Sequence, residues 1–241
     1  MKFLFKKVKA EFLKLLRYYF RLFSWQGKTF KIDIDINYKW YGNEYGGFYV
    51  ADILLDKDSI IYSVGIGEDI SFDKAINSKY GCKVFMFDPT PKSIKWVSNL
   101  NLNNQFVFHE YGLYNETCQK TFYLPKKSEH ISGSLVQNLN VNSNDSFLVN
   151  LLTIEDISKI YGHSKIDVLK IDIEGAEYDV LDSILNSKLE ITQILIEFHS
   201  RFLSNGIELT KTAVGKLHNS GYKIFAFSKT FEEVSFIKTV K

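Results

Sequence analysis

Residues 60–69 read IIYSVGIGED, an apolar run that leads directly into two closely spaced glycines. The run at 60–64 is rich in Ile, Tyr and Val, which are typical of a buried strand, and a helical pattern over residues 71–79 follows the glycines. Glycines at a strand-to-helix turn let the backbone approach a ligand, and the start of a helix offers free N–H groups to an anion. We therefore expect Gly65, Gly67, Glu68 and Asp69 to border a ligand site.

Strand and helix patterns alternate from residue 60 to the end of the chain. Such alternation predicts an α/β fold with a doubly wound, mostly parallel seven-stranded sheet. The last two strands are separated only by residues 228–233, too few for a helical crossover, so the last strand should be antiparallel. The predicted strands are 60–64, 83–87, 105–109, 166–171, 191–198, 222–227 and 234–238, and the predicted helices are 71–79, 92–99, 154–160, 176–185 and 209–218.

The segment 110–165 lacks a clear pattern outside its one predicted helix, and Asn and Ser crowd residues 137–146. We interpret it as a loop or short hairpin with Gly133 at its most constrained turn. Long irregular segments in a compact domain are often lids or binding loops. Acceptor specificity is expected to reside here.

Composition favours one globular domain with an appendage. The chain has 241 residues, of which 45% are hydrophobic and 24% charged, values that exclude a disordered protein. The two cysteines, Cys82 and Cys118, form no CxxC pair, which argues against a disulfide scaffold or a structural zinc. The formal charge of +2 divides into +7 for residues 1–28 and −5 for the remaining 213. A mildly acidic body argues against binding to nucleic acid.

Residues 1–28 form a basic amphipathic pattern, which divides the chain into an arm (1–28) and a main domain (29–241). Its apolar residues recur at helical spacing, with Lys and Arg between them, and its apolar runs are too short to span a bilayer. One interpretation is a helix on an anionic membrane surface, and the other is a helix packed on the domain or on a second subunit. We expect a cytoplasmic protein, peripheral at the inner membrane surface if the first interpretation holds. The apolar positions are Phe5, Val8, Phe12, Leu15, Leu16, Tyr19, Leu22 and Phe23.

The second strand ends in Asp88-Pro89, 23 residues beyond Gly65. An acidic side chain at this place can accept hydrogen bonds from both hydroxyls of a ribose, and we expect it to be solvent-accessible. A dinucleotide fingerprint would require glycine at position 70, where the chain has Ile70, so an adenosine ligand without a pyrophosphate fits better. The alternative is that the glycines only form a turn and Asp88 only caps the next helix.

Ionisable residues gather at the ends of two further strands. The run KIDIEGAE at 170–177 follows one strand, and strand alternation would point Lys170, Asp172 and Glu174 the same way. The run IEFH at 196–199 places Glu197 and His199 on one face of another. Ligands of open α/β sheets bind beyond the carboxyl ends of the strands, so we expect these groups to form a site.

The run LKIDIEGAEYDVL at 169–181 resembles the core motif of the FkbM-type methyltransferases. Asp88-Pro89 and the Glu-x-His at 197–199 sit where that family has counterparts, and the resemblance covers residues 45–227. The family loop has Asp at the place of Ser63 and a third glycine near Asp69, so the resemblance is to a divergent branch of the family. The resemblance implies a Rossmann-like class I methyltransferase fold, S-adenosylmethionine as cofactor, and methyl transfer to a hydroxyl oxygen of a sugar, glycan or related natural product.

The chemistry of methyl transfer suggests a role for each group. His199 is the natural base, oriented by Glu197 or Glu174, although it could instead be a strand-end histidine satisfied by backbone. Asp172 would face the cofactor or bind a metal together with Glu174, and Glu174 or Glu177 could simply stabilise a helix start. His109 and Tyr111 would border an adenine, and His130 is a weaker base candidate.

Two other function classes remain open. One is a catalytically silent nucleoside-binding or scaffolding module of the same fold, and the other is a nicotinamide-dependent oxidoreductase. The acceptor, metal dependence and a homo-oligomeric state are also left open.

Overall fold

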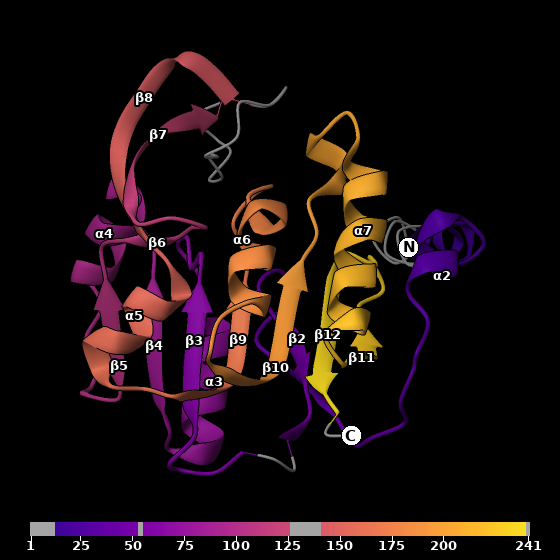
Figure 1. The fold of residues 1–241 in the computed structure, drawn as a ribbon, viewed down its shortest axis with the longest axis horizontal. Helices are drawn as coiled ribbons and strands as arrows, with labels where there is room; N and C mark the ends of the chain where they lie inside the picture. Colours follow the sequence, from indigo (N-terminus) through magenta and orange to yellow (C-terminus); the bar gives the residue numbers. More distant parts are fainter. Residues whose placement is uncertain (1–12, 53–54, 126–140, 240–241) are drawn as a thin grey trace, which may run out of the picture.

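The computed structural model describes residues 13–52, 55–125 and 141–239. Its centre is a seven-stranded sheet with the order β11-β12-β10-β9-β3-β4-β5 (Figure 1). The strands from β10 to β5 pair in parallel, and β12 is antiparallel to both of its neighbours. The predicted fold class, including the antiparallel last strand, is therefore confirmed. The strand bounds are β3 Ile60–Val64, β4 Lys83–Phe87, β5 Phe106–His109, β9 Lys165–Ile171, β10 Glu190–Glu197, β11 Tyr222–Phe227 and β12 Glu233–Lys238.

Helices cover both faces of this sheet, because its central strands are apolar on both sides. On one face, α5 (Ile154–Tyr161), α6 (Glu177–Leu185) and α7 (Gly206–Asn219) enclose the larger core cluster. On the other face, α3 (Ser71–Tyr80) and α4 (Pro91–Ser98) enclose a second core cluster. The five helices lie where the sequence pattern predicts them, with ends that differ by up to three residues.

A hairpin that the sequence pattern did not predict completes the second face. Its strands are β1 (Lys39–Tyr41) and β2 (Phe48–Val50), which pair antiparallel. Phe48 and Val50 are buried in the second core cluster. Strands of three residues are too short for a recognisable alternation of apolar and polar residues.

The segment 110–165 is more regular than expected. A long antiparallel hairpin of β7 (Cys118–Pro125) and β8 (Val141–Leu152) occupies it, and β6 (Gly112–Leu113) pairs in parallel with β8. The expected hairpin is present, but it is long rather than short, and the alternative of a loop is wrong over these strands. Side chains alternate from exposed Ser146 to buried Leu151, so a period-2 signal was present there. His130 and Gly133 lie outside the described residues.

The described part of the arm is helical, as predicted. Residues 13–22 form a helix, and α2 (Trp25–Thr29) follows and lies beside α7 (Figure 1). Tyr18, Leu22 and Trp25 pack against the larger core cluster. No helix within the described ranges is long and apolar enough to cross a bilayer.

Candidate active site

The turn after β3 is held against the turn after β9. Gly65 has a φ of 75° and Gly67 a φ of 53°, in the left-handed region that favours glycine. A Cβ on Gly65 would lie 1.7 Å from the backbone oxygen of Asp172. The glycine at position 65 is therefore required for these two turns to meet.

Asp88 organises the same turn from the end of β4. One carboxylate oxygen accepts hydrogen bonds from the Gly67 N–H at 2.9 Å and the other from the Thr90 N–H at 2.9 Å and its hydroxyl at 2.6 Å. Asp88 is only 5% exposed, so the expectation of a solvent-accessible side chain is wrong. The carboxylate nevertheless lines the cavity described next. Thr90, not Asp88, is the N-cap of α4.

A cavity of about 390 Å³ lies at the carboxyl ends of the central strands, a size usual for small-molecule sites. The turns after β3, β4 and β9 form its floor, and Asn43, Tyr45 and Phe122 contribute from the two hairpins. The candidate residues that line it are Gly65, Gly67, Glu68, Asp69, Asp88, Pro89, Asp172 and Glu174.

Tyr111 and His109 do not line this cavity. The two rings stack with centroids 5.0 Å apart, and Phe87 packs against both of them. Burial raises the pKa of the Tyr111 phenol and lowers that of the His109 imidazole. Their assignment to the adenine site stays a prediction. The neighbouring Gly112 and Leu113 line the cavity in their place.

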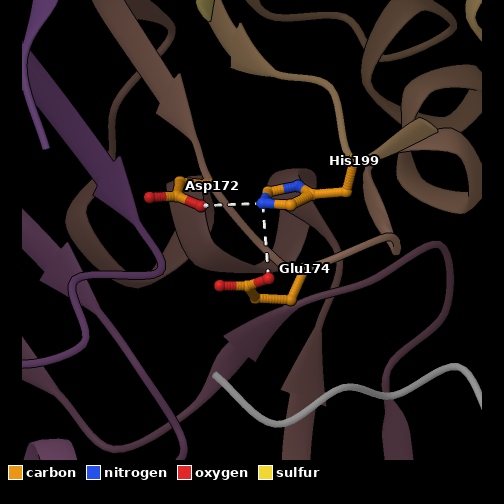
Figure 2. Close-up of side chains that lie close together, drawn as sticks. All are labelled: Asp172, Glu174 and His199. Atoms are coloured by element: carbon orange, nitrogen blue, oxygen red, sulfur yellow. Dashed lines mark ion pairs between the residues drawn. The ribbon is translucent and has the colours of Figure 1, made fainter. Parts of the chain in front are cut away.

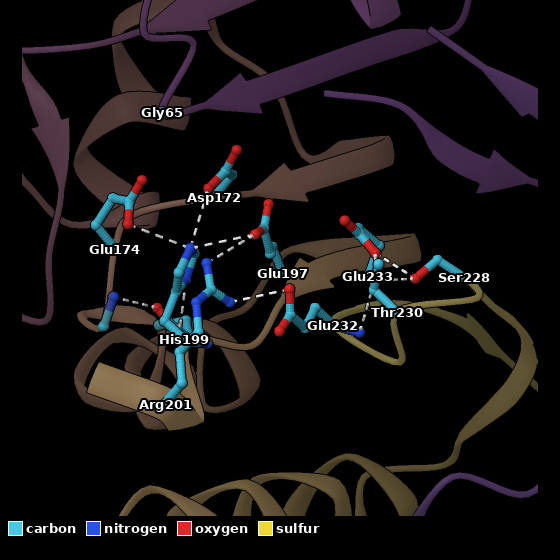
Figure 3. Close-up of polar contacts among 12 residues, drawn as sticks. Gly65, Asp172, Glu174, Glu197, His199, Arg201, Ser228, Thr230, Glu232 and Glu233 are labelled. Atoms are coloured by element: carbon cyan, nitrogen blue, oxygen red, sulfur yellow. Dashed lines mark hydrogen bonds and ion pairs between the residues drawn. The ribbon is translucent and has the colours of Figure 1, made fainter. Parts of the chain in front are cut away.

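Three carboxylates converge on one nitrogen of His199. Its Nε2 atom lies 3.3 Å from Glu174 Oε2, 3.4 Å from Glu197 Oε1 and 3.7 Å from Asp172 Oδ1. Figure 2 shows Asp172 and Glu174 approaching the imidazole from the turn after β9, and Figure 3 adds Glu197. His199 is 1% exposed and does not line the cavity. Asp172 and Glu174 thus stand between the cavity and the buried imidazole.

Glu177 locks this arrangement from the start of α6. Its carboxylate accepts hydrogen bonds from the backbone N–H groups of Gly175, at 2.8 Å, and of His199, at 2.7 Å. It therefore joins the turn after β9 to the end of β10. The sequence reasoning treated Glu177 as a helix-start charge. No sequence signal indicated the hydrogen bond between Glu177 and the backbone of His199, because the two residues are 22 positions apart.

Electrostatics within the cluster favour a charged imidazole. Burial alone lowers the pKa of His199, but the Glu177, Glu197 and Glu174 carboxylates outweigh burial and hold that pKa well above 6.5. Burial and the Asp172 charge raise the pKa of Glu197 to about 7, against the opposing effect of His199. His199 therefore neutralises part of the carboxylate charge beside the cavity.

Lys170 supports the glycine turn from beneath. It is 3% exposed, its Nζ donates to the Gly65 carbonyl oxygen at 3.2 Å, and it lies 3.8 Å from Asp172. Burial raises the pKa of Asp73, while the Lys170 charge and the neighbouring Ser63 hydroxyl oppose that rise. Asp73 thus brings a carboxylate from α3 to Ser63, where the loop of the resembled family carries Asp. Asp73 was not predicted to lie near the site, because the sequence around it shows only a helical pattern.

A cation could also use part of the cluster. Asp172, Glu174 and His199 offer ligand atoms that all lie within 4.8 Å of one another. Carboxylate and imidazole are suitable ligands for divalent metals. The ion pairs of the same groups with one another account for their positions equally well.

A comparison with models of protein families shows which family this chain belongs to. Residues 62–224, more than half of the sequence, match the methyltransferase FkbM domain. The chain belongs to the FkbM methyltransferase family. The resemblance to the FkbM-type methyltransferases is confirmed over residues 62–224.

Two curated relatives match part of this chain. Probable methyltransferase-like protein 24 of Homo sapiens is 30% identical over 154 residues, and that of Rattus norvegicus is 28% identical over 156 residues. Each match covers 63% of this chain and 36% of the relative. The chain therefore matches only about a third of the length of these relatives.

Two solved structures are more distant. Aeropyrum pernix fibrillarin, in complex with S-adenosyl-L-methionine, has a TM-score of 0.40 and 11% identity over 76% of this chain and 66% of its own. Human N-acetylserotonin methyltransferase, also in complex with S-adenosyl-L-methionine, has a TM-score of 0.38 and 13% identity over 78% of this chain and 49% of its own.

Proposed function

We propose that this FkbM protein transfers a methyl group from S-adenosylmethionine to a hydroxyl oxygen of a saccharide or a related natural product. The observation that carries the proposal is that one cavity is lined both by the glycine turn with Asp88 and by Asp172 and Glu174 of the His199 cluster. A nucleoside subsite and a proton-accepting subsite therefore adjoin.

The cofactor side suits a nucleoside better than a dinucleotide. Gly65 and Gly67 keep the backbone close to the cavity, and Asp88 holds the turn while facing the cavity. Ile70, where a dinucleotide loop would have glycine, is 2% exposed and packs into the second core cluster. This packing disfavours the oxidoreductase alternative.

When bound, S-adenosylmethionine supplies an electrophilic methyl group on a sulfonium. The protein then has to align the acceptor oxygen and take up its proton. During transfer, the new C–O bond forms, the C–S bond breaks and S-adenosylhomocysteine leaves. The hydroxyl proton passes to the protein.

Glu174 and Asp172 are the groups of the cluster that an acceptor in the cavity can meet. His199 lies behind them, and the neighbouring carboxylates raise its pKa, which favours its cationic form. In our proposal, Glu174 or Asp172 accepts the hydroxyl proton, while His199 and Glu197 position these carboxylates and balance their charge. The expectation that His199 itself is the base stays a prediction.

The lining of the cavity includes groups that suit a saccharide. Asn43, Tyr45 and Lys92 line it, and they offer an aromatic surface and hydrogen-bonding groups. Phe122 on β7 faces the same cavity, which supports a role for the β7–β8 hairpin in acceptor choice.

The test has a binding arm and a transfer arm. S-adenosylhomocysteine should raise the melting temperature and NAD should not, and labelled methyl should pass from S-adenosylmethionine to members of a saccharide panel. Glu174→Gln should keep the S-adenosylhomocysteine response and lose transfer, whereas the exposed Glu208→Gln on α7 should change neither. Binding without transfer to any hydroxyl compound would favour the silent module, and stabilisation by NAD alone would favour the oxidoreductase.

A further inference from the structure

The helix over residues 13–22 is fixed to the body by one of its faces. The Tyr18 ring lies 5.7 Å from the ring of Phe231, and Leu22 packs against the larger core cluster. The Arg21 guanidinium donates to the Thr230 carbonyl oxygen and lies 3.7 Å from Glu232. These contacts hold the helix on the turn between β11 and β12.

The opposite face of the same helix carries an exposed apolar stripe. Leu13, Leu16, Phe20 and Phe23 follow one another at steps of three and four, so they share one side of the helix. Their exposed fractions are 43%, 50%, 78% and 80%. Contiguous apolar surface of this kind marks an interaction site, and within the described residues nothing covers it.

The positive charge around this apolar stripe indicates which kind of surface it binds. Residues 1–28 contain eight Lys or Arg and one Glu, and Arg17 is exposed on the same helix. An apolar stripe on a strongly basic helix is complementary to an anionic bilayer, in which the apolar side chains enter the headgroup region and the cations meet lipid phosphates. We propose that residues 13–23 attach this protein to the surface of an anionic membrane and thereby place its active site at that surface.

A row of charged side chains joins the membrane-binding helix to the site. Glu232 lies between Arg21, at 3.7 Å, and Arg201, at 3.0 Å. Arg201 also lies 3.8 Å from Glu197, the neighbour of His199, and Figure 3 shows Arg201 between Glu197 and Glu232. The helix is therefore docked at the end of the sheet that carries the site.

This placement narrows the acceptor class. A site held at a bilayer surface meets hydroxyl groups that membrane lipids carry, so the acceptor is a saccharide linked to a lipid. This part rests on the proposed function, whereas membrane attachment does not.

Vesicle flotation tests the attachment. The full chain should bind phosphatidylcholine vesicles that contain phosphatidylglycerol, should bind pure phosphatidylcholine vesicles less, and should dissociate as salt rises. Phe20→Glu should weaken binding by about tenfold or more, the ratio expected when one large apolar side chain no longer enters the lipid. The matched control Ile160→Glu, an exposed apolar position on α5, should bind as the unaltered chain does.

Three outcomes would overturn membrane attachment. They are an unaltered chain that fails to bind anionic vesicles, a Phe20→Glu variant that binds them fully, and a Phe20→Glu variant that converts a dimer into a monomer in size-exclusion chromatography. The last result would assign the apolar stripe to a second copy. Failure of the proposed function would look different, because vesicle binding would persist while S-adenosylhomocysteine gave no thermal shift.

Discussion

Gly65 lies where the glycine turn after β3 approaches the turn after β9 closely. Gly65→Ala would place its Cβ 1.7 Å from a backbone oxygen, in addition to the strain of a φ of 75°. Gly81→Ala is a matched control, because Gly81 has a φ of 69° and no atom within 4 Å of the added Cβ. We expect Gly81→Ala to lower the free energy of unfolding by about 1–2 kcal/mol and Gly65→Ala to lower it much more and abolish S-adenosylhomocysteine binding. Denaturant unfolding and calorimetry would measure both, and equal effects of the two variants would contradict the close approach.

Asp88 combines a structural and a ligand role, since the hydrogen bonds from Gly67 and Thr90 use much of its acceptor capacity. Hydrogen bonds to charged groups contribute about 1.5–3 kcal/mol each. Asp88→Ala should therefore weaken S-adenosylhomocysteine binding and also lower the melting temperature, whereas the exposed Lys95→Ala on α4 should do neither. Calorimetry and thermal melting check this. Full affinity in Asp88→Ala would remove the carboxylate from the cofactor site.

The His199 cluster predicts a pH dependence of stability. A histidine with a raised pKa stabilises the fold below about pH 6.5, and this contribution is lost as pH rises through the folded-state value. Glu197, raised from 4.5 to about 7, acts in the same direction, because the fold favours its protonated form. The free energy of unfolding should therefore fall as pH rises from about 5 to above 7.

Glu197→Gln should flatten this pH profile. The substitution removes one ionisation and one of the carboxylates that raise the pKa of His199, while Asp172, Glu174 and Glu177 remain near the ring. Denaturant titrations at several pH values would provide the profile. An unchanged slope would mean that the cluster does not titrate in this range.

At the scale of elements, Lys170 couples β9, the turn after β3 and α3. Its charge opposes the burial effect on Asp73 and faces Asp172 at 3.8 Å. Removing one partner of a buried charged pair costs about 3–5 kcal/mol, whereas replacing both is often far milder. We expect Lys170→Met to destabilise the protein by about that amount, because Asp172, 3.8 Å away, loses its partner and the buried Asp73 carboxyl loses a nearby positive charge. Lys170→Met with Asp73→Asn should recover part of the loss. A double-mutant cycle measures the coupling, and strictly additive effects would contradict it.

Elements differed in how well the sequence predicted them. The bounds of β3, β4 and β11 agree with the prediction because each is a short apolar run closed by polar or glycine residues. The length of the β7–β8 hairpin was not predicted, because the hairpin lies outside the main sheet and its strands mix apolar residues with Asn and Ser. In such a hairpin, cross-strand pairing supplies the order that propensity does not.

At the scale of the whole molecule, the arm both packs on the body and exposes an apolar stripe. The two interpretations of the arm are therefore compatible, because they concern opposite faces of one helix. A chain that begins at Thr29 should lose the packing of Tyr18, Leu22 and Trp25. We expect its melting temperature to fall by roughly 5 °C while S-adenosylhomocysteine still raises it. An unchanged melting temperature would contradict the docking of the helix.

The sequence alone determined the strands of the seven-stranded sheet and the five helices between them, the antiparallel last strand and the glycine turn that lines the cavity. These follow from local causes: the period of apolar residues, a connection too short for a crossover, and the backbone freedom of glycine. Only the tertiary structure decided that His199 lies buried behind Asp172 and Glu174, that Glu177 ties their turn to β10, and that Tyr111 packs on Phe87 and His109 rather than lining the cavity. These features depend on which strand ends become neighbours and on how deeply each side chain is enclosed. Burial and charge at such contacts arise from residues distant in sequence, so no local pattern encodes them.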